Sequence, residues 1–188
     1  MNTRQNRDPQ LISRENTLLA VVDVQERLYP HIAGNEAMRV EIARLIRFAA
    51  IVGLPVVHVE QEKLGPTIES LAVLLGEDKA AVKQTFGSFG CAGFVESLAN
   101  RRFDTLVLTG IETHVCVLQT AFGALQRGLR VQVVADAVGS RSPCNKETAL
   151  ARMRAAGVEV TCAESFIFEI MGRSGTEEFR RVLELLKS

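Results

Sequence analysis

The segment Gly128-Leu129-Arg130-Val131-Gln132-Val133-Val134 shows how this chain alternates between two kinds of secondary structure. A glycine at the end of a helical pattern closes the helix, and the apolar run after it predicts a buried strand. The same order of helix, glycine and strand recurs at Gly53 and at Gly157. Strands are expected to begin near Leu18, Val56, Ala80, Leu106, Val131 and Val158.

Helices are expected between these strands, because apolar residues recur there with the i, i+3, i+4, i+7 spacing of one helix face. The two clearest stripes are Ile42, Leu45, Ile46 and Ala49, and Val115, Leu118, Phe122 and Leu125. Strands that are apolar throughout and alternate with helices indicate a parallel sheet covered on both faces. We therefore predict an α/β fold: a Rossmann-like, three-layer α/β/α sandwich around a six-stranded, mostly parallel sheet.

The composition indicates a compact folded chain. Of its 188 residues, 47% are hydrophobic and 23% are charged, which is enough for one sizeable core. We expect a single domain over residues 1–188, with a polar N-terminal segment over residues 1–16. Lys plus Arg and Asp plus Glu both number 22, so no basic field predicts binding to nucleic acid or to anionic lipid.

The chain shows no sign of export or of insertion into a membrane. No apolar run is long enough to span a bilayer, and the polar N-terminal segment lacks a signal-peptide core. The four cysteines, at positions 91, 116, 144 and 162, have no Cys-x-x-Cys spacing. This favours reduced thiols and predicts a cytoplasmic location.

Cys116 lies in residues 109–117 (TGIETHVCV), where an apolar strand turns through a glycine into a helix. The positive end of the helix dipole and unpaired backbone N–H groups can lower the pKa of a thiol there and hold an oxyanion. The arrangement suits a nucleophile. The alternative interpretation is a small buried hydrophobic side chain in a tightly packed turn.

Two charged residues also follow apolar runs. Asp23 ends the run over residues 18–22, and in open α/β sheets the ligand crevice lies outside the carboxyl ends of the strands. Alternatively, Asp23 is the N-cap of the segment after it. Lys83 follows a short apolar stretch near residue 80, and its alternative interpretation is a solvated surface residue.

Taken together, these positions resemble the isochorismatase-like cysteine hydrolases, a superfamily that includes nicotinamidases and N-carbamoylsarcosine amidases. The matching segments are residues 21–25 (VVDVQ), 83–89 (KQTFGSF) and 109–117 (TGIETHVCV). They occur in the family's order with similar spacing, and the resemblance extends from about residue 17 to residue 168. The most similar subgroup is the small isochorismatase-domain proteins, which carry a Glu-Gln…Leu-Gly-Pro-Thr loop.

The resemblance implies hydrolysis of a small amide, ureido or related C–N bond through a thioester on Cys116. Asp23 is then the base and Lys83 stabilises the thiolate. The implied oxyanion hole consists of the backbone N–H groups of Glu112 and Cys116, next to a non-proline cis peptide between Ile111 and Glu112. Family members commonly assemble, so we also expect a homo-oligomer, either a dimer or something larger.

The expected substrate pocket combines apolar walls with a few polar anchors, as small-molecule sites require. Its residues are placed in loops that the topology brings to the same edge of the sheet. They are Gln25, Gln61, Phe86, Ser88, Phe89 and Thr113. For Phe86 and Phe89, packing within the loop is the alternative.

The three histidines are not expected to join this chemistry. His114 is two residues from Cys116, and helical residues two apart face different directions, so we interpret it as a turn or interface residue. His58 lies within an apolar strand and is expected in the core or at a sheet edge. His31 falls in an expected loop, where it could line a pocket mouth.

We expect neither a metal nor another cofactor. Nicotinamidases carry a metal site with two closely spaced histidines after the second strand, whereas residues 60–67 here contain no histidine. Nicotinamidase activity is therefore not expected. The first strand leads to Asp23 without a Gly-x-Gly-x-x-Gly motif, so a dinucleotide is not expected either. The predicted partner is a small-molecule substrate, not nucleic acid or membrane.

Two other functions remain open on the same fold. One is a non-catalytic or redox-responsive binding or regulatory protein. The other is an enzyme acting on a non-amide bond, in which the cysteine only assists. The pKa of the Cys116 thiol bears on the choice, because a structural cysteine should titrate near or above the ordinary thiol value.

Overall fold

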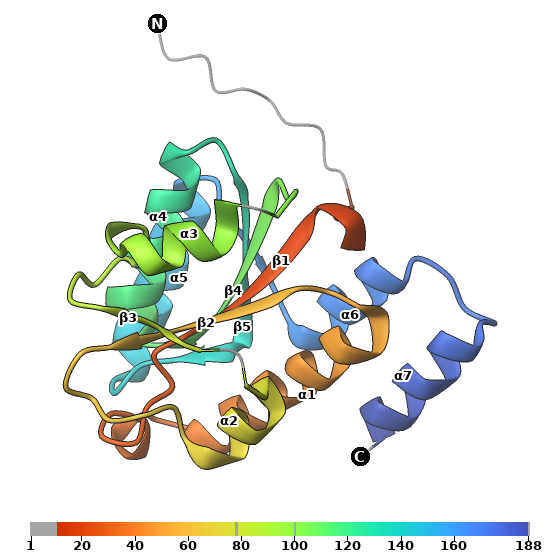
Figure 1. The fold of residues 1–188 in the computed structure, drawn as a ribbon, viewed down its shortest axis with the longest axis horizontal. Coiled ribbons are helices and arrows are strands. Elements are labelled where there is room, and N and C mark those ends of the chain that lie inside the picture. The colour runs from red at the N-terminus through yellow and green to blue at the C-terminus, as the bar shows by residue number, and fades with distance from the viewer. Residues whose placement is uncertain (1–10, 78, 100, 188) are drawn as a thin grey trace, which may run out of the picture.

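The computed structural model describes residues 11–77, 79–99 and 101–187, and its core is a six-stranded sheet (Figure 1). The strands are β1 (Thr17–Val22), β2 (Val56–Gln61), β3 (Ala81–Lys83), β4 (Thr105–Ile111), β5 (Arg130–Gly139) and β6 (Glu159–Thr161). Their order across the sheet is β3-β2-β1-β4-β5-β6, and all five neighbouring pairs are parallel. The predicted sheet is confirmed.

Helices cover both faces of this sheet (Figure 1). They are α1 (Asn35–Val52), α2 (Glu69–Leu75), α3 (Ala92–Ala99), α4 (Leu118–Gln126), α5 (Pro143–Ala155), α6 (Ala163–Met171) and α7 (Glu177–Lys187). Buried residues of α1, α2, α6 and α7 form one hydrophobic cluster, and those of α3, α4 and α5 form the other. The predicted three-layer sandwich is therefore confirmed as well.

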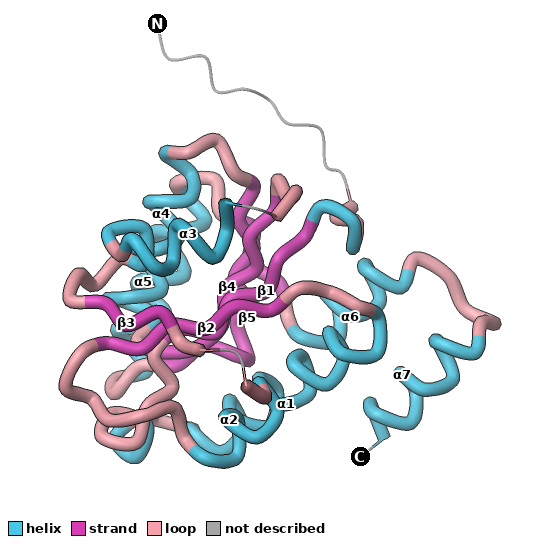
Figure 2. The backbone as a smooth tube through the Cα atoms, in the orientation of Figure 1, coloured by secondary structure: helices cyan, strands magenta, loops and turns pink. Residues whose placement is uncertain are grey.

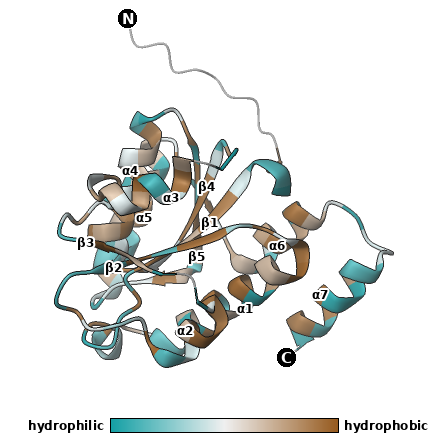
Figure 3. Ribbon diagram, viewed as in Figure 1, coloured by the Kyte–Doolittle hydropathy of each residue, from teal (hydrophilic) through white to brown (hydrophobic). Residues whose placement is uncertain are grey.

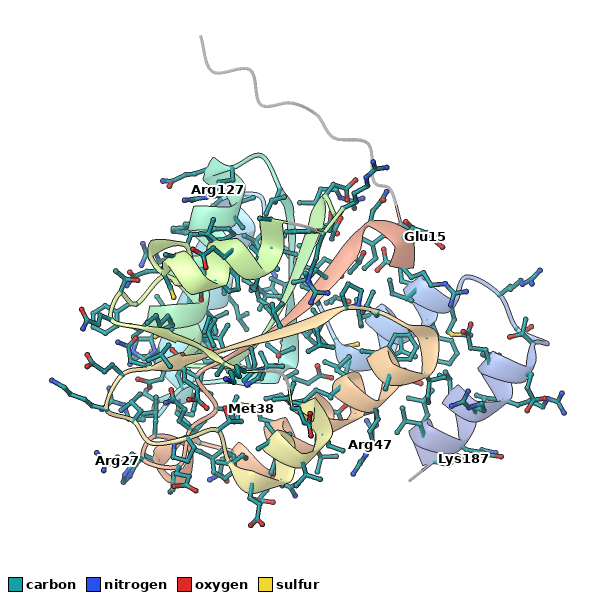
Figure 4. The ribbon with its side chains drawn as sticks, in the orientation of Figure 1. Glu15, Arg27, Met38, Arg47, Arg127 and Lys187 are labelled. Atoms are coloured by element: carbon teal, nitrogen blue, oxygen red, sulfur yellow. The ribbon has the colours of Figure 1, made fainter. Side chains whose placement is uncertain are left out.

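Strand β1 shows how one apolar run supplies both layers. Leu19 and Val21 pack in the cluster with α1, whereas Leu18 and Ala20 pack in the cluster with α4. Successive side chains of a strand point to opposite faces, so a strand covered on both sides must be apolar throughout. Figure 3 shows this hydrophobic colouring concentrated along the central strands, with hydrophilic residues on the outer helices. The labelled charged residues in Figure 4 lie at the periphery, whereas Met38 is 3% exposed.

The three glycines that predicted helix ends have the backbone conformation of such ends. Gly53, Gly128 and Gly157 have φ of 70°, 78° and 94°, and a strand begins soon after each of them. A left-handed residue after the last helical turn satisfies terminal carbonyl groups and redirects the chain, and glycine adopts it without steric cost. These local signals explain why the strand positions could be predicted.

Gly110 fixes the contact between the two central strands. It has φ of +104°, and a Cβ atom built on it would lie 2.0 Å from the carbonyl oxygen of Val22. No side chain fits in that space, so only glycine allows β4 to lie this close to the end of β1. The contact occurs where the sheet order changes direction, at the topological switch point that binds ligands in doubly wound folds.

The second predicted helical stripe is correct in part. Leu118 is buried, but Val115, Phe122 and Leu125 are only partly buried, and the fully buried face of α4 includes Ala121 instead. The chain forms a π-helical turn over Thr113–Val117 before α4 begins. The π turn changes the helical phase at Val115 only, whereas Phe122 and Leu125 lie within α4 itself, where Thr120, Ala121 and Ala124 are the buried residues beside Leu118. The stripe on α1, in contrast, is buried at all four predicted positions.

At the N-terminal end, residues 1–10 of the predicted polar segment lie outside the described residues, and Arg14–Asn16 form a short 3-10 turn. Within the described part of the chain, none of the helices combines the length and apolar character needed to cross a membrane. The loops that follow β1 and β2 lie at the same end of the sheet (Figure 2). That end carries the candidate site.

Candidate active site

Asp23 follows the last residue of β1 and is completely buried, with 0% of its surface exposed. Its φ of 52° puts it in the left-handed region, which aspartate adopts more readily than most residues. Its backbone N–H donates to the carbonyl oxygen of Val59, the neighbouring residue on β2, at 3.1 Å. A non-glycine residue held in this conformation at a sheet's switch point is a recognised mark of functional sites.

Lys83 ends β3 and reaches Asp23 across the carboxyl end of β2. Its Nζ lies 2.7 Å from Oδ2 of Asp23, and both side chains have 0% exposure. Burial raises the pKa of the Asp23 carboxyl, and the charge and hydrogen bond of Lys83 oppose that rise. Two buried charges are tolerated together because each neutralises the other. The surface alternative for Lys83 is therefore wrong.

Gln61, at the end of β2, is the second partner of Lys83. Lys83 Nζ donates to Gln61 Oε1 at 2.7 Å. At its other end, Nε2 of Gln61 donates to the carbonyl oxygen of Gln84 at 2.9 Å. Both ends of the Gln61 amide are thus used inside the protein, whereas the sequence predicted a substrate contact.

Gln25, another expected substrate contact, ties the loop after β2 to the loop after β1. Its Oε1 accepts from the backbone N–H of Gln61 at 2.8 Å, and its Nε2 donates to the carbonyl oxygens of Gln61 and Gly65 at 3.0 and 2.5 Å. Only 1% of Gln25 is exposed. The contacts of Gln25 are therefore structural, because its amide is already saturated by backbone groups.

Cys116 lies in the π-helical turn after β4 and is 6% exposed. The backbone N–H groups of Val115 and Val117, on either side of it, both donate to the carbonyl oxygen of Glu112, at 3.1 and 3.2 Å. The turn thus wraps around the Glu112 carbonyl and fixes the backbone that carries the thiol. The thiol is placed by backbone hydrogen bonds.

The surroundings of Cys116 raise its pKa instead of lowering it. Burial raises the pKa of the thiol to about 12, the negative charge of Asp23 adds to the rise, and Lys83 opposes it. The expected decrease at a helix start is therefore not found, because burial and the neighbouring Asp23 carboxylate raise the pKa of this thiol. Both charged residues act on the thiol, while Asp23 Oδ1 has no hydrogen-bond partner among the described residues.

The peptide bond between Ile111 and Glu112 is cis, as the resemblance implied. The Glu112 carboxylate is held from the loop after β5, because its Oε1 accepts from the backbone N–H and the Nε of Arg141 at 3.0 and 3.1 Å. Arg141 was not among the predicted residues. No sequence pattern could have found it, since it is 29 positions away and is brought to Glu112 only by the pairing of β4 with β5.

The other four expected pocket residues have different surroundings. Ser88 is 0% exposed and its Oγ bonds Thr120 Oγ1 at 2.9 Å, so it belongs to the packing against α4. Thr113 is also 0% exposed, and its Oγ1 has no hydrogen-bond partner in the described structure. Because both hydroxyls are buried, neither reaches solvent in this arrangement.

The two phenylalanines of the loop after β3 point to different places. Phe89 packs edge-on against Phe94 at 5.2 Å between ring centroids, and the Arg127 guanidinium lies 4.4 Å from its ring centroid. Figure 4 labels Arg127 at the periphery, near α4. Phe89 thus follows the loop-packing alternative. Phe86 is 54% exposed and remains available for contact with a ligand.

The hydrogen bonds of His114 are to residues outside the Asp23, Lys83 and Cys116 cluster. His114 Nδ1 bonds Ser140 Oγ at 3.0 Å, and its Nε2 lies 3.4 Å from Asn145 Nδ2. His58 is half-buried in β2, and His31 is exposed in a 3-10 turn. In residues 11–77, 79–99 and 101–187, no three ligating His, Cys, Asp or Glu side chains gather closely enough to hold a metal ion.

A parallel sheet with a buried acid, ammonium and thiol at its switch point defines an α/β protein of isochorismatase-like architecture. The family model of the isochorismatase domain matches residues 17–165, and the chain belongs to this family.

Three similar proteins illustrate the family. Isochorismatase domain-containing protein 2A of Mus musculus is 33% identical over 92% of this chain and 84% of its own length. The structure of MAR1 ribonuclease from Caenorhabditis elegans is 34% identical, with a TM-score of 0.88 over 95% of this chain and 93% of that chain. The YcaC gene product of Escherichia coli, titled an octameric hydrolase of unknown specificity, is 20% identical, with a TM-score of 0.85 over 95% of this chain and 89% of that one.

Proposed function

We propose that this protein hydrolyses a small amide, ureido or related C–N bond through a thioester intermediate on Cys116. The observation that carries the proposal is the buried pair of Asp23 and Lys83, 2.7 Å apart, with both charges acting on the same thiol. A fully buried ion pair needs a reason to be kept, since apolar residues of similar volume are often at least as stable. Catalysis provides that reason.

In the proposed reaction, the thiol starts in its neutral form because its pKa is about 12. The Asp23 carboxylate takes the S–H proton as sulfur attacks the carbonyl carbon, so the C–S bond forms and the carbonyl electron pair moves to oxygen. Lys83 stabilises the negative charge on sulfur while the proton leaves. Because proton transfer to Asp23 and attack by sulfur occur together, the resting protein does not need a thiolate.

The tetrahedral oxyanion would be held by the backbone N–H groups of Glu112 and Cys116. When the electron pair returns to carbon, the C–N bond breaks and protonated Asp23 gives its proton to the leaving nitrogen. Water then attacks the thioester and gives a proton to Asp23, the C–S bond breaks, and Asp23 returns that proton to the departing sulfur to restore the thiol. The sum is one amide plus water giving one acid plus one amine or ammonia.

The second candidate is a non-catalytic binding or regulatory protein on the same fold. The raised pKa and the 6% exposure of Cys116 favour it, since a structural thiol has the same properties. The buried charges beside the thiol favour the hydrolase, because a structural cysteine needs neither of them.

The ribonuclease name of the Caenorhabditis elegans relative raises RNA as a competing substrate. Equal numbers of acidic and basic residues give this chain no overall positive charge to attract a polyanion. The three residues proposed for catalysis are at most 6% exposed, which suits a small substrate better than a folded polymer. We therefore place small amides first and include RNA as a competitor in the test.

The experiment measures ammonia or amine release and intact protein mass with a panel of small amides and ureides, and RNA cleavage in parallel. Cys116→Ala should abolish turnover and any acyl adduct. Cys91→Ala is the matched control, because Cys91 is also buried, at 8% exposure, but lies beside β3 and donates to the Val82 carbonyl oxygen. Full activity in Cys116→Ala would refute the mechanism. Cleavage of RNA without hydrolysis of any small amide or ureide would show that RNA, not a small C–N compound, is the substrate.

We further propose that the protein works as a homo-oligomer, because the structurally similar Escherichia coli YcaC gene product is described as an octamer. Light scattering after gel filtration tests this directly. A single species of one chain's mass, 20.6 kDa, at micromolar concentration would contradict it.

A further inference from the structure

The Lys83 ammonium has three N–H donors, and the structure accounts for two of them. One is directed to Asp23 Oδ2 and another to Gln61 Oε1, both at 2.7 Å. Asp23 follows β1 and Gln61 ends β2, so the two acceptors hold the ammonium from two directions. The remaining donor is the one free to act on the thiol of Cys116, with which Lys83 also interacts.

Gln61 is itself held at several points. Its side-chain Nε2 is bound to the Gln84 carbonyl oxygen, and its backbone N–H and carbonyl oxygen are bound to the Gln25 amide. The side chain therefore cannot rotate without breaking the bond to Gln84. An acceptor fixed at both ends of its amide is built to position its donor, not to bind a passing molecule.

The type of residue matters as much as its position. A neutral amide oxygen orients the ammonium without cancelling its charge. A second carboxylate at this point would give Lys83 two anionic partners and leave less positive potential for the sulfur. An apolar side chain would leave one ammonium N–H buried without a partner.

We propose that Gln61 is a positioning residue for the proposed hydrolase, which fixes Lys83 so that its remaining N–H is directed at Cys116. The proposal rests on the hydrolytic function given above. It replaces the substrate contact that the sequence predicted for Gln61. Gln61 acts only through Lys83 and does not touch the reacting atoms.

The test follows alkylation of Cys116 by iodoacetamide between about pH 8 and pH 10, with the modified residue identified by peptide mass mapping. Only the thiolate reacts, so the rate reports the thiol's ionisation without any substrate. Gln61→Met keeps the side-chain length but removes both polar groups, and Gln61→Glu replaces the neutral acceptor by a charged one. Gln126→Met makes the same chemical change at an exposed position at the end of α4.

We expect Gln61→Met to slow alkylation of Cys116 by about threefold or more at each pH, because a shift of half a pKa unit changes the thiolate fraction by that factor. Gln61→Glu should slow it further, and Gln126→Met should leave it unchanged. With an identified substrate, kcat should fall while KM stays constant. Melting temperatures are measured first, and Gln61→Glu carries the test if Gln61→Met is unfolded at the assay temperature.

Unchanged alkylation in folded Gln61 variants, together with a raised KM, would overturn the proposal and restore the substrate contact. Unchanged alkylation and unchanged kinetics would overturn it in favour of a purely structural residue. Because alkylation needs no turnover, absence of hydrolysis in the wild type would reject the proposed function and leave the positioning result to be read separately.

Discussion

The two halves of the sheet contribute different chemistry to the site. The half formed by β1, β2 and β3 supplies charged and amide side chains, and these are fixed by side-chain hydrogen bonds between 2.5 and 3.0 Å. The half that begins with β4 supplies the sulfur and the proposed backbone donors, fixed by a π-helical turn. The charged groups are therefore placed by partner side chains, whereas the proposed nucleophile is placed by backbone geometry.

The largest expected effect comes from removing one charge in the first half. Lys83→Met leaves Asp23 buried without its counter-charge, which should lower the free energy of unfolding by about 3–5 kcal/mol. Urea unfolding measures this. Lys79→Met, at an exposed lysine near the start of β3, should stay within about 0.5 kcal/mol of the wild type. Equal stability of the two variants would mean that the ion pair does not link β1 and β3.

The second prediction is that one substitution in the first half, Asp23→Asn, has opposite effects on turnover and on the alkylation rate of Cys116. Asp23→Asn should reduce turnover by about 10²–10⁴-fold, the usual contribution of a general base. It should also accelerate alkylation of Cys116 at pH 9 by about tenfold or more, because the Asp23 charge raises the pKa of the thiol. Circular dichroism confirms folding of the variant. Slower alkylation in a folded Asp23→Asn protein would contradict the assigned electrostatics.

The third prediction tests how the halves are held together. Gly110→Ala should lower the free energy of unfolding by about 2–3 kcal/mol or more, because its Cβ would overlap the Val22 carbonyl oxygen. Gly157→Ala is the control, since φ there is also positive, at +94°, but no atom lies within 4 Å of the added Cβ. It should cost only about 1 kcal/mol. Thermal or urea unfolding measures the loss of stability in both variants. Equal losses for Gly110→Ala and Gly157→Ala would contradict the close contact between β4 and the end of β1.

The smallest effect is a shift in pH dependence. Asp23 must be ionised to act as a base, and burial raises the pKa of its carboxyl. Activity should therefore be lost as pH falls through that raised pKa, at a higher pH than an ordinary aspartate near 3.9 would give. A profile of kcat/KM against pH measures the acid limb. An acid limb at or below the ordinary value would show that Lys83 outweighs burial.

Much of the fold could be predicted because its signals are local. The helix-ending glycines and the apolar runs after them lie within a few residues of one another, so they indicate strands without knowledge of the tertiary structure. The positions of Asp23 and Cys116 follow from the same signals, since Asp23 comes directly after β1 and Cys116 lies in the turn after β4. The parallel topology then brought them to one edge.

The remaining features of the site depend on contacts between distant segments. Gln61 meets Gln25 across 36 positions and Lys83 across 22, so no local pattern indicates that its amide is already hydrogen-bonded. The pKa of Cys116 was misjudged for the same reason, because burial is a property of the folded protein. The buried face of α4 differs from the predicted stripe because small residues, Thr120, Ala121 and Ala124, face the core there, and a pattern of large apolar residues does not indicate them.

The burial of Cys116 also has a consequence for the protein's chemical durability. Oxidation by peroxide attacks the thiolate of an accessible cysteine. With a pKa of about 12 and 6% exposure, the Cys116 thiol is rarely ionised and hardly accessible to solvent. Cys116 should therefore resist conversion to sulfenic acid in the resting protein. The arrangement therefore argues against a redox sensor at this position. It also lets the residue outlast oxidising conditions that would consume a permanently ionised cysteine.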